Sequence, residues 1–180
     1  MMTSPARVLI RQLIDPNTEF LELSRGAGFG IGYDQAARDH DLRIAAYPNH
    51  LVIYSAGNSG NAQGYAPYNF AACPADPAAC WANITGQMKQ SKNMLSIGAL
   101  DPSDVLTYFS SRGPMYDGRI IPQVAIEGIE GTSDAAPKVT GELAMLAQVY
   151  KAKNVGAEPA SRRFARRKAS SRSTLKSASS

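Results

Sequence analysis

The chain has 180 residues, of which 44% are hydrophobic, and a formal net charge of +4. This length suits a single domain with a sizeable core, and no apolar run approaches the length of a membrane-spanning helix. Residues 1–150 carry 10 Lys and Arg against 14 Asp and Glu, whereas residues 151–180 carry 9 against 1, so the basic character belongs to the end of the chain.

The first predicted elements are a strand, a helix and a second strand. Residues 17–24, "NTEFLELS", predict a strand that ends in a Gly-rich stretch, and residues 33–48 predict a helix that stops at Pro48. Residues 51–56 form a continuous apolar run, which is typical of a parallel strand covered on both faces. That strand breaks sharply into "GNSG" at 57–60.

The second half of the chain predicts a loop, further strands and a long helix. Residues 61–92 indicate a long loop, 93–100 a second buried strand, and 105–126 strands around Gly-Pro and Asp-Gly turns. A helix is predicted over 133–152, with Pro137 in its first turn. Its apolar residues recur at spacings of four, three and four, at Val139, Leu143, Leu146 and Tyr150.

Strands alternating with helices predict an α/β fold with a mostly parallel sheet flanked by helices. Ligand sites in such sheets form where strands end at their carboxyl edges, and Asn58 lies at such an end. Residues 1–16 remain unassigned, residues 17–154 form the predicted domain, and residues 155–180 form a basic Ser/Arg-rich tail predicted to be disordered.

The two cysteines, Cys73 and Cys80, flank "PADPAA". This spacing fits a small loop disulfide or two free thiols, and the sequence alone does not decide between them. No cluster of His and Cys accompanies them, so no metal site is predicted.

Three stretches occur in a set order along the chain: "SAGNSG" at 55–60, "FSSRGP" at 109–114 and "GTSDAAPKVTG" at 131–141. Together they resemble the subtilisin-like serine peptidases, the peptidase S8 family, over roughly residues 20–150. The resemblance implies a three-layer subtilisin-like architecture. It covers only the C-terminal part of the family's catalytic domain, so the fold is expected to be incomplete on its N-terminal side.

The resemblance implies an acyl-serine mechanism without a cofactor. By similarity Ser133 is the nucleophile, at a helix N-terminus where free N–H groups and the helix dipole favour negative charge. Asn58 matches the family's oxyanion-hole asparagine, and Gly57 beside it is expected to contribute to substrate binding. The implied substrate is a polypeptide.

A substrate-lining strand is the next implied feature. The stretch "LELSRGAG" resembles the family's Ser-x-Gly strand, so Ser24, Arg25 and Gly26 are expected to pair with an extended peptide. Two positions depart from the family pattern around the nucleophile. Asp134 replaces the more usual Met or His, and Lys138 stands where many members have His.

The family's Asp and His motifs, D-[ST]-G and H-G-T-H, are absent from this sequence. His50 precedes the strand 51–56, so it lies roughly 20 Å from the strand end that carries Asn58. His40 lies between two aspartates and is expected to be a solvated surface histidine. Without a base the serine is a poor nucleophile, so we expect little activity from this chain alone. A truncated gene product, with the missing N-terminal half of the domain as its partner, is the simplest hypothesis.

The rival function is a non-catalytic, peptide-binding pseudo-protease module with a basic tail. The tail has one aromatic residue and no folded motif, so nucleic-acid binding is not favoured, and no membrane partner is expected. The opening of the chain has no signal-peptide core although the family is mostly exported, so the sequence leaves the compartment open. "NIT" at 83–85 is a glycosylation sequon by pattern only.

Overall fold

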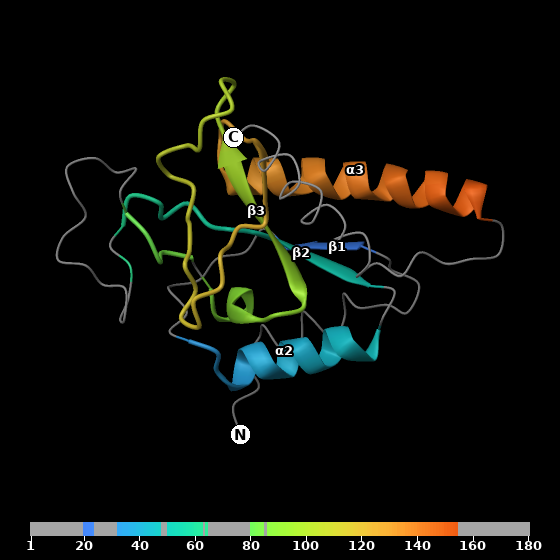
Figure 1. Ribbon diagram of the computed structural model, residues 1–180, viewed down its shortest axis with the longest axis horizontal. Helices are drawn as coiled ribbons and strands as arrows, with labels where there is room; N and C mark the ends of the chain where they lie inside the picture. The colour runs from blue at the N-terminus through green and yellow to red at the C-terminus, as the bar shows by residue number, and fades with distance from the viewer. Residues whose placement is uncertain are drawn as a thin grey trace, which may run out of the picture.

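The computed structural model describes residues 20–23, 32–47, 50–62, 64, 80–84 and 86–154 (Figure 1). These ranges contain four strands, two α-helices and one 3₁₀ helix: β1 (Phe20–Leu23), α2 (Gln35–Ala46), β2 (Leu51–Ser55), η2 (Gln87–Gln90), β3 (Met94–Leu100), β4 (Val124–Glu127) and α3 (Thr132–Lys153). The predicted segments 1–16 and 155–180, and most of the predicted loop 61–92, lie outside the described residues.

The four strands form one parallel sheet in the order β1-β2-β3-β4. Each strand is followed in space by its successor in the chain, and β2 pairs with β3 in the register Ile53 to Leu95. The predicted α/β fold with a parallel sheet is thereby confirmed. Because all strands run the same way, the segments that follow β2 and β4 meet at one edge of the sheet.

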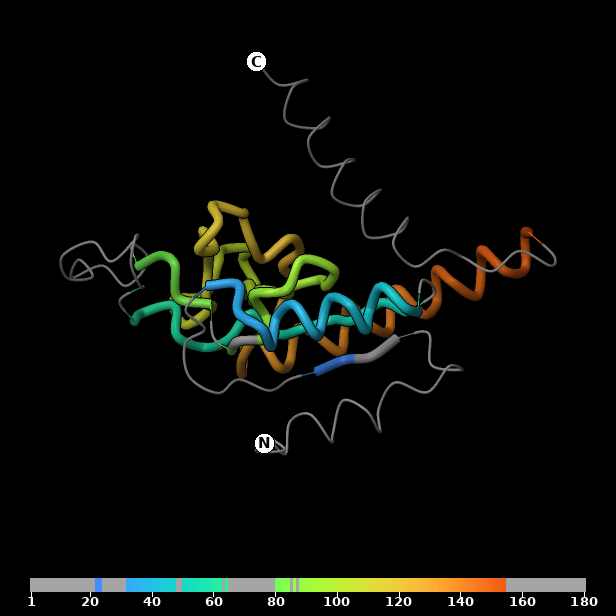
Figure 2. Tube along the Cα trace, turned by 90° about the horizontal axis from the view of Figure 1, so that it is seen from below, coloured from blue at the N-terminus to red at the C-terminus, as the bar shows by residue number. Residues whose placement is uncertain are grey.

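The apolar run of β2 is buried on both faces, as its sequence predicts. Leu51 and Ile53 belong to a core cluster with α3, whereas Val52 and Tyr54 pack on the opposite face with Ile44 of α2. Figure 1 shows α3 and α2 on opposite sides of the sheet, and Figure 2 shows both helices running along the long axis of the molecule. This is the expected three-layer arrangement.

Helix α3 matches the predicted span 133–152 to within one residue at each end. Pro137 does not lie in the first turn as predicted, because the helix begins at Thr132 and the proline is its sixth residue. Pro137 has no N–H, so the carbonyl of Ser133 receives no i+4 hydrogen bond. Leu146 is exposed although Leu143 and Ala147 are buried, so it lies on the solvent side of α3 and not on the face that packs on the sheet.

The prediction of strands over 105–126 is wrong for most of that segment. It contains one isolated bridge, from Leu106 back to Leu100, and strand β4 at its end. Between them the chain makes turns, such as the one closed by the Met115 N–H on the Arg119 carbonyl at 2.8 Å. Side chains satisfy much of this backbone, so a regular ladder is not needed to pair its polar groups.

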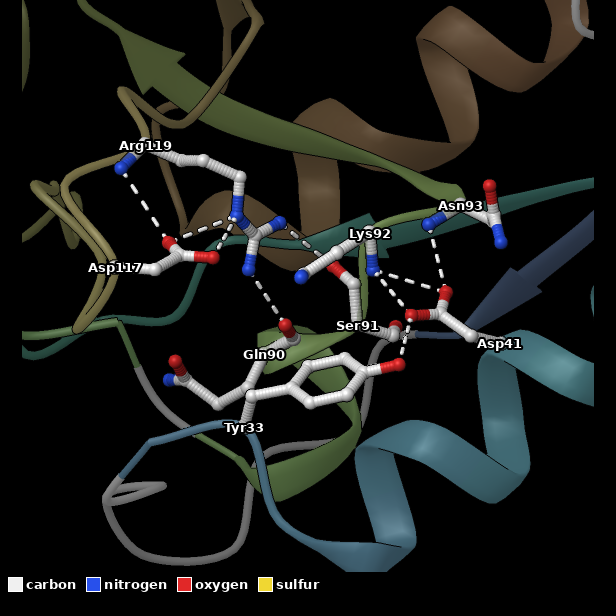
Figure 3. A network of polar contacts seen from close by, with 8 residues as sticks. All are labelled: Tyr33, Asp41, Gln90, Ser91, Lys92, Asn93, Asp117 and Arg119. Carbon is white, nitrogen blue, oxygen red and sulfur yellow. Dashed lines mark hydrogen bonds and ion pairs between the residues drawn. The ribbon is translucent and has the colours of Figure 1, made fainter.

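A polar network ties α2 to the start of β3 (Figure 3). The buried Asp41 carboxylate accepts the N–H groups of Lys92, at 2.9 Å, and Asn93, at 2.8 Å, and the Tyr33 hydroxyl at 2.8 Å. On the other side of η2, the Arg119 guanidinium donates to the carbonyls of Gln90 and Ser91. These bonds fix the helix layer on the sheet at the end away from Ser133.

Cys80 is buried and takes part in a disulfide, so it is not a free thiol. Cys73 lies outside the described residues. Neither of the α-helices in the described ranges is both long and apolar enough to cross a membrane.

Candidate active site

Ser133 is the second residue of α3, directly after the short connection from β4. Its side chain is exposed. As one of the first four residues of the helix, it has an N–H group without an acceptor inside the helix, and the helix dipole adds positive character there. The predicted nucleophile therefore lies where an anion would be stabilised.

Asn58 follows β2 and is held against the start of α3 by Thr132. Its Oδ1 accepts the Thr132 N–H at 3.0 Å and the Thr132 hydroxyl at 2.9 Å. The same hydroxyl oxygen accepts the Gly57 N–H at 3.1 Å. Because Oδ1 is engaged by two donors, the amide orientation is fixed and Nδ2 is left facing the other way.

The Asn58 amide and the Ser133 hydroxyl converge beside Gly131. Asn58 Nδ2 lies 2.9 Å, and Ser133 Oγ 3.3 Å, from the position that a Cβ on Gly131 would take. Gly131 has a φ of 155°, a backbone conformation that residues other than glycine rarely adopt. Because Gly131 has no side chain, the Asn58 amide and the Ser133 hydroxyl can both lie close to its Cα.

Gly57 lies beside Asn58 but its main-chain groups face the protein. Its N–H bonds to Thr132 Oγ1, and its carbonyl accepts the Ser111 N–H at 2.8 Å. Gly57 therefore fixes the start of the loop that carries Asn58. The predicted substrate residues Ser24, Arg25 and Gly26 lie outside the described residues.

The two departures from the family pattern pair with each other. Lys138 Nζ lies 3.2 Å from Asp134 Oδ2, one helical turn earlier, and also donates to the Glu127 carbonyl at 3.2 Å. The carboxylate that follows Ser133 is therefore balanced by an ammonium group, and the pair connects the first turns of α3 to the end of β4. Both side chains are partly exposed, so the pair adds little stability.

Neither histidine approaches Ser133. His50 immediately precedes β2 and its ring stacks on Tyr47, with the ring centroids 5.0 Å apart. It lies at the amino end of the strand whose carboxyl end leads to Asn58, as predicted.

His40 is not the predicted surface residue but is buried in α2 against the sheet. Its Nε2 lies 3.0 Å from the Tyr54 hydroxyl, and burial lowers its pKa to about 4. The polar neighbours in the sequence were misleading because Asp41 turns inward as well, to bind backbone N–H groups. Tyr54 belongs to the α2 face of β2, whereas α3 covers the other face.

Two features of the site were not predicted from the sequence. Thr132 fixes the Asn58 amide, and its only signal was its place in "GTS". Ser111 supports the same loop, since its Oγ accepts the Ser59 N–H at 2.9 Å. Within the described ranges no group of three or more His, Cys, Asp or Glu side chains is arranged to hold a metal ion.

The sequence profile of the subtilase family matches residues 23–178. Among solved structures, the chain is similar to the prenylagaramide maturation protease PagA, at 20% identity and a TM-score of 0.60, over 87% of this chain and 52% of that one.

A second similar structure is the self-cleaved protease domain of PatA, at 19% identity and a TM-score of 0.57, over 87% of this chain and 55% of that one. A third is the PatG macrocyclase in complex with peptide, at 14% identity and a TM-score of 0.58, over 88% of this chain and 45% of that one. The chain thus spans about half the length of these structures. At such identities the likeness shows a common fold.

Proposed function

Because the chain belongs to the subtilase family, we propose that it carries the nucleophile and the oxyanion hole of a serine endopeptidase. The observation that carries the proposal is that Asn58 Nδ2 and Ser133 Oγ both lie beside the same backbone position, Gly131. Attack on a peptide carbonyl requires an amide donor and a hydroxyl that lie close together in this way.

In the proposed mechanism Ser133 Oγ attacks the carbonyl carbon of the scissile bond and loses its proton to a base. The carbonyl oxygen becomes negative and is bound by Asn58 Nδ2 and by the Ser133 N–H at the start of α3. The C–N bond then breaks, the amine leaves with a proton, and the acyl group stays on Ser133. Water hydrolyses this ester and restores the serine.

The base is proposed to come from a polypeptide segment outside this sequence, the missing N-terminal half of the domain. His40 lies on the α2 face and His50 at the amino end of β2, which supports an external base. Without its base, a catalytic serine reacts about 10⁶-fold more slowly than in the complete enzyme. The oxyanion hole and substrate binding still accelerate the reaction about 10³–10⁴-fold over the uncatalysed rate. We therefore expect little hydrolysis from this chain by itself.

A polypeptide is the proposed substrate, with Ser24, Arg25 and Gly26 pairing with its backbone in an extended form. The structurally similar PatG macrocyclase, solved in complex with peptide, supports this choice of substrate class. Neither a metal nor a cofactor is needed for the chemistry.

The first test is covalent labelling of Ser133 by a fluorophosphonate probe, followed over hours on gels. We expect slow labelling that is absent in Ser133→Ala and accelerated by a polypeptide carrying the family's H-G-T-H motif. Equal labelling of the wild-type chain and Ser133→Ala would exclude Ser133 as the nucleophile.

The alternative is a pseudo-protease that binds peptides without cleaving them. It is favoured by the placement of both histidines away from Ser133. This function predicts that residues 1–150 bind extended peptides while no added segment accelerates the labelling of Ser133. DNA binding that disappears on deletion of 155–180 would instead assign a role to the tail.

A further inference from the structure

The side chain of Asn83 is fully buried, and its partners among the described residues are main-chain groups. Its Nδ2 donates to the carbonyls of Gly60, at 3.1 Å, and Ala62, at 3.0 Å. Its Oδ1 accepts the Arg112 N–H at 2.8 Å. One amide group thus connects three stretches of chain: the segment after Asn58, the segment around 112 and its own.

Residues 57–62, called the oxyanion loop below, carry Asn58 and belong to neither helix nor strand. Their backbone groups therefore need partners from elsewhere. One side of the loop is bonded by Ser111, whose Oγ accepts the Ser59 N–H and whose N–H binds the Gly57 carbonyl. In the second half of the loop, the Gly60 N–H bonds to the Phe109 carbonyl and the Ala62 N–H to the Ser59 carbonyl, whereas the carbonyls of Gly60 and Ala62 accept from Asn83.

The loop also lies so close to the 108–110 segment that its position tolerates little change. A Cβ on Gly60 would come within 2.4 Å of the Ser110 carbonyl oxygen. Without the Asn83 amide, the carbonyls of Gly60 and Ala62 would lose their bonds in this tight contact. Buried polar groups left unpaired favour a rearranged backbone.

From these contacts we propose that Asn83 is a positioning residue for the oxyanion loop: it fixes the backbone that aims the Asn58 amide at the space beside Ser133. The proposal rests on the proposed role of Asn58 and extends it to a residue 23 positions beyond Gly60 in the sequence. Asn83 touches no reacting atom and acts only through the loop.

The contacts require an asparagine specifically. Aspartate keeps an acceptor for the Arg112 N–H but has no N–H groups for the two carbonyls, and a hydroxyl side chain cannot donate to two acceptors at once. The burial of Asn83 also bears on whether the "NIT" sequon at 83–85 could carry a glycan. A glycan on Asn83 would displace these bonds, so the folded chain offers no glycosylation site there.

The test compares rates of Ser133 labelling by the fluorophosphonate probe in the full chain. We expect Asn83→Asp to lower the rate about 10- to 100-fold, since a small displacement of an aligned group has effects of this size. Asn154→Asp, the same chemical change at an exposed asparagine at the far end of α3, serves as the matched control and should label at the wild-type rate.

A double-mutant comparison separates positioning from general destabilisation. In an Asn58→Ala background, Asn83→Asp should lower the rate no further, because the amide it positions is already gone. An equal fold-loss in both backgrounds, or a wild-type rate in folded Asn83→Asp, would overturn the proposal. Failure of Ser133→Ala to abolish labelling would instead overturn the proposed function.

A measurement on the wild-type chain covers the case in which Asn83→Asp does not fold. Hydrogen exchange by NMR should show the Asn83 side-chain N–H₂ protected, and exchanging together with the backbone N–H groups of Gly60 and Arg112. Free exchange of that side chain under conditions where the two backbone groups stay protected would show that the amide does not fix the loop.

Discussion

Gly131→Ala places a methyl group directly in the space between the two proposed catalytic side chains. The new Cβ would lie 2.9 Å from Asn58 Nδ2 and 3.3 Å from Ser133 Oγ, and the first distance is too short for unstrained contact. The backbone there has φ of 155°, which costs a residue other than glycine about 1–3 kcal/mol. We therefore expect the free energy of unfolding to fall by about that amount.

The effect of Gly131→Ala on reactivity should exceed its effect on stability. The Asn58 amide must move to relieve the contact, and loss of one oxyanion donor in subtilisin costs about 10²–10³ in kcat. The rate of Ser133 labelling by a fluorophosphonate should therefore fall by a comparable factor, about 10²-fold, while circular dichroism shows a folded chain.

Gly141→Ala is the matched control for this change. Gly141 lies within α3, and a Cβ on it would meet nothing within 4 Å. Alanine should stabilise the helix by about 0.5–1 kcal/mol and leave the labelling rate unchanged. A folded Gly131→Ala chain that labels as fast as wild type would refute the view that the space beside Gly131 is the reactive one.

Three further predictions concern single buried groups. Thr132→Val should lose about 1–3 kcal/mol of unfolding free energy and should slow the labelling of Ser133, because the Gly57 N–H loses its acceptor. Thr132→Ser keeps the hydroxyl, so its unfolding free energy and its labelling rate should stay near wild type. Equal behaviour of the two variants in denaturation and labelling would contradict this role of the Thr132 hydroxyl. His40 has a folded-state pKa of about 4, below its ordinary 6.5, so the unfolded chain binds the proton first. The free energy of unfolding should therefore fall by up to about 3 kcal/mol as the pH drops from 6.5 to 4, and denaturation of His40→Phe should lack this loss. The same pH profile in His40→Phe and wild type would show that His40 is not the group responsible. Burial of Lys89 lowers its pKa to about 8 from 10.5, and its Nζ has no hydrogen-bond partner among the described residues. Lys89→Met should therefore raise the free energy of unfolding by about 1–3 kcal/mol at pH 7, and this gain should shrink as the pH rises from 8 to 10.5. A lower free energy of unfolding at pH 7 would contradict this prediction.

The sheet and its main helix could be predicted because their patterns are strong and local. The apolar run of β2 has no polar residue until its end, and Val139 and Leu143 recur at helical spacing in α3. The rule that sites form at the carboxyl edge of a parallel sheet predicts the place of Asn58, which follows β2. The pairing of Asn58 with Ser133 was implied by the resemblance to the subtilisin-like peptidases and not by the periodicity of the sequence.

Contacts between distant side chains and backbone could not be predicted in the same way. Thr132 binds Gly57 across 75 positions, and Asn83 binds Arg112 across 29. Nothing in the periodicity of the sequence distinguishes these residues from ordinary polar loop residues. His40 was misjudged for a related reason, since its burial depends on Tyr54, in another element on the same face of the sheet.

The features that hold Ser133 and Asn58 together do not involve the base. Thr132 and the oxyanion loop fix Asn58, and Lys138 connects the first turns of α3 to the Glu127 carbonyl, all within the described residues. An active half-domain and a pseudo-protease would therefore share this geometry, and a motif search cannot separate them. What separates them is a proton acceptor within about 3 Å of the Ser133 hydroxyl. A segment that supplies this acceptor should accelerate the labelling of Ser133 without moving Asn58.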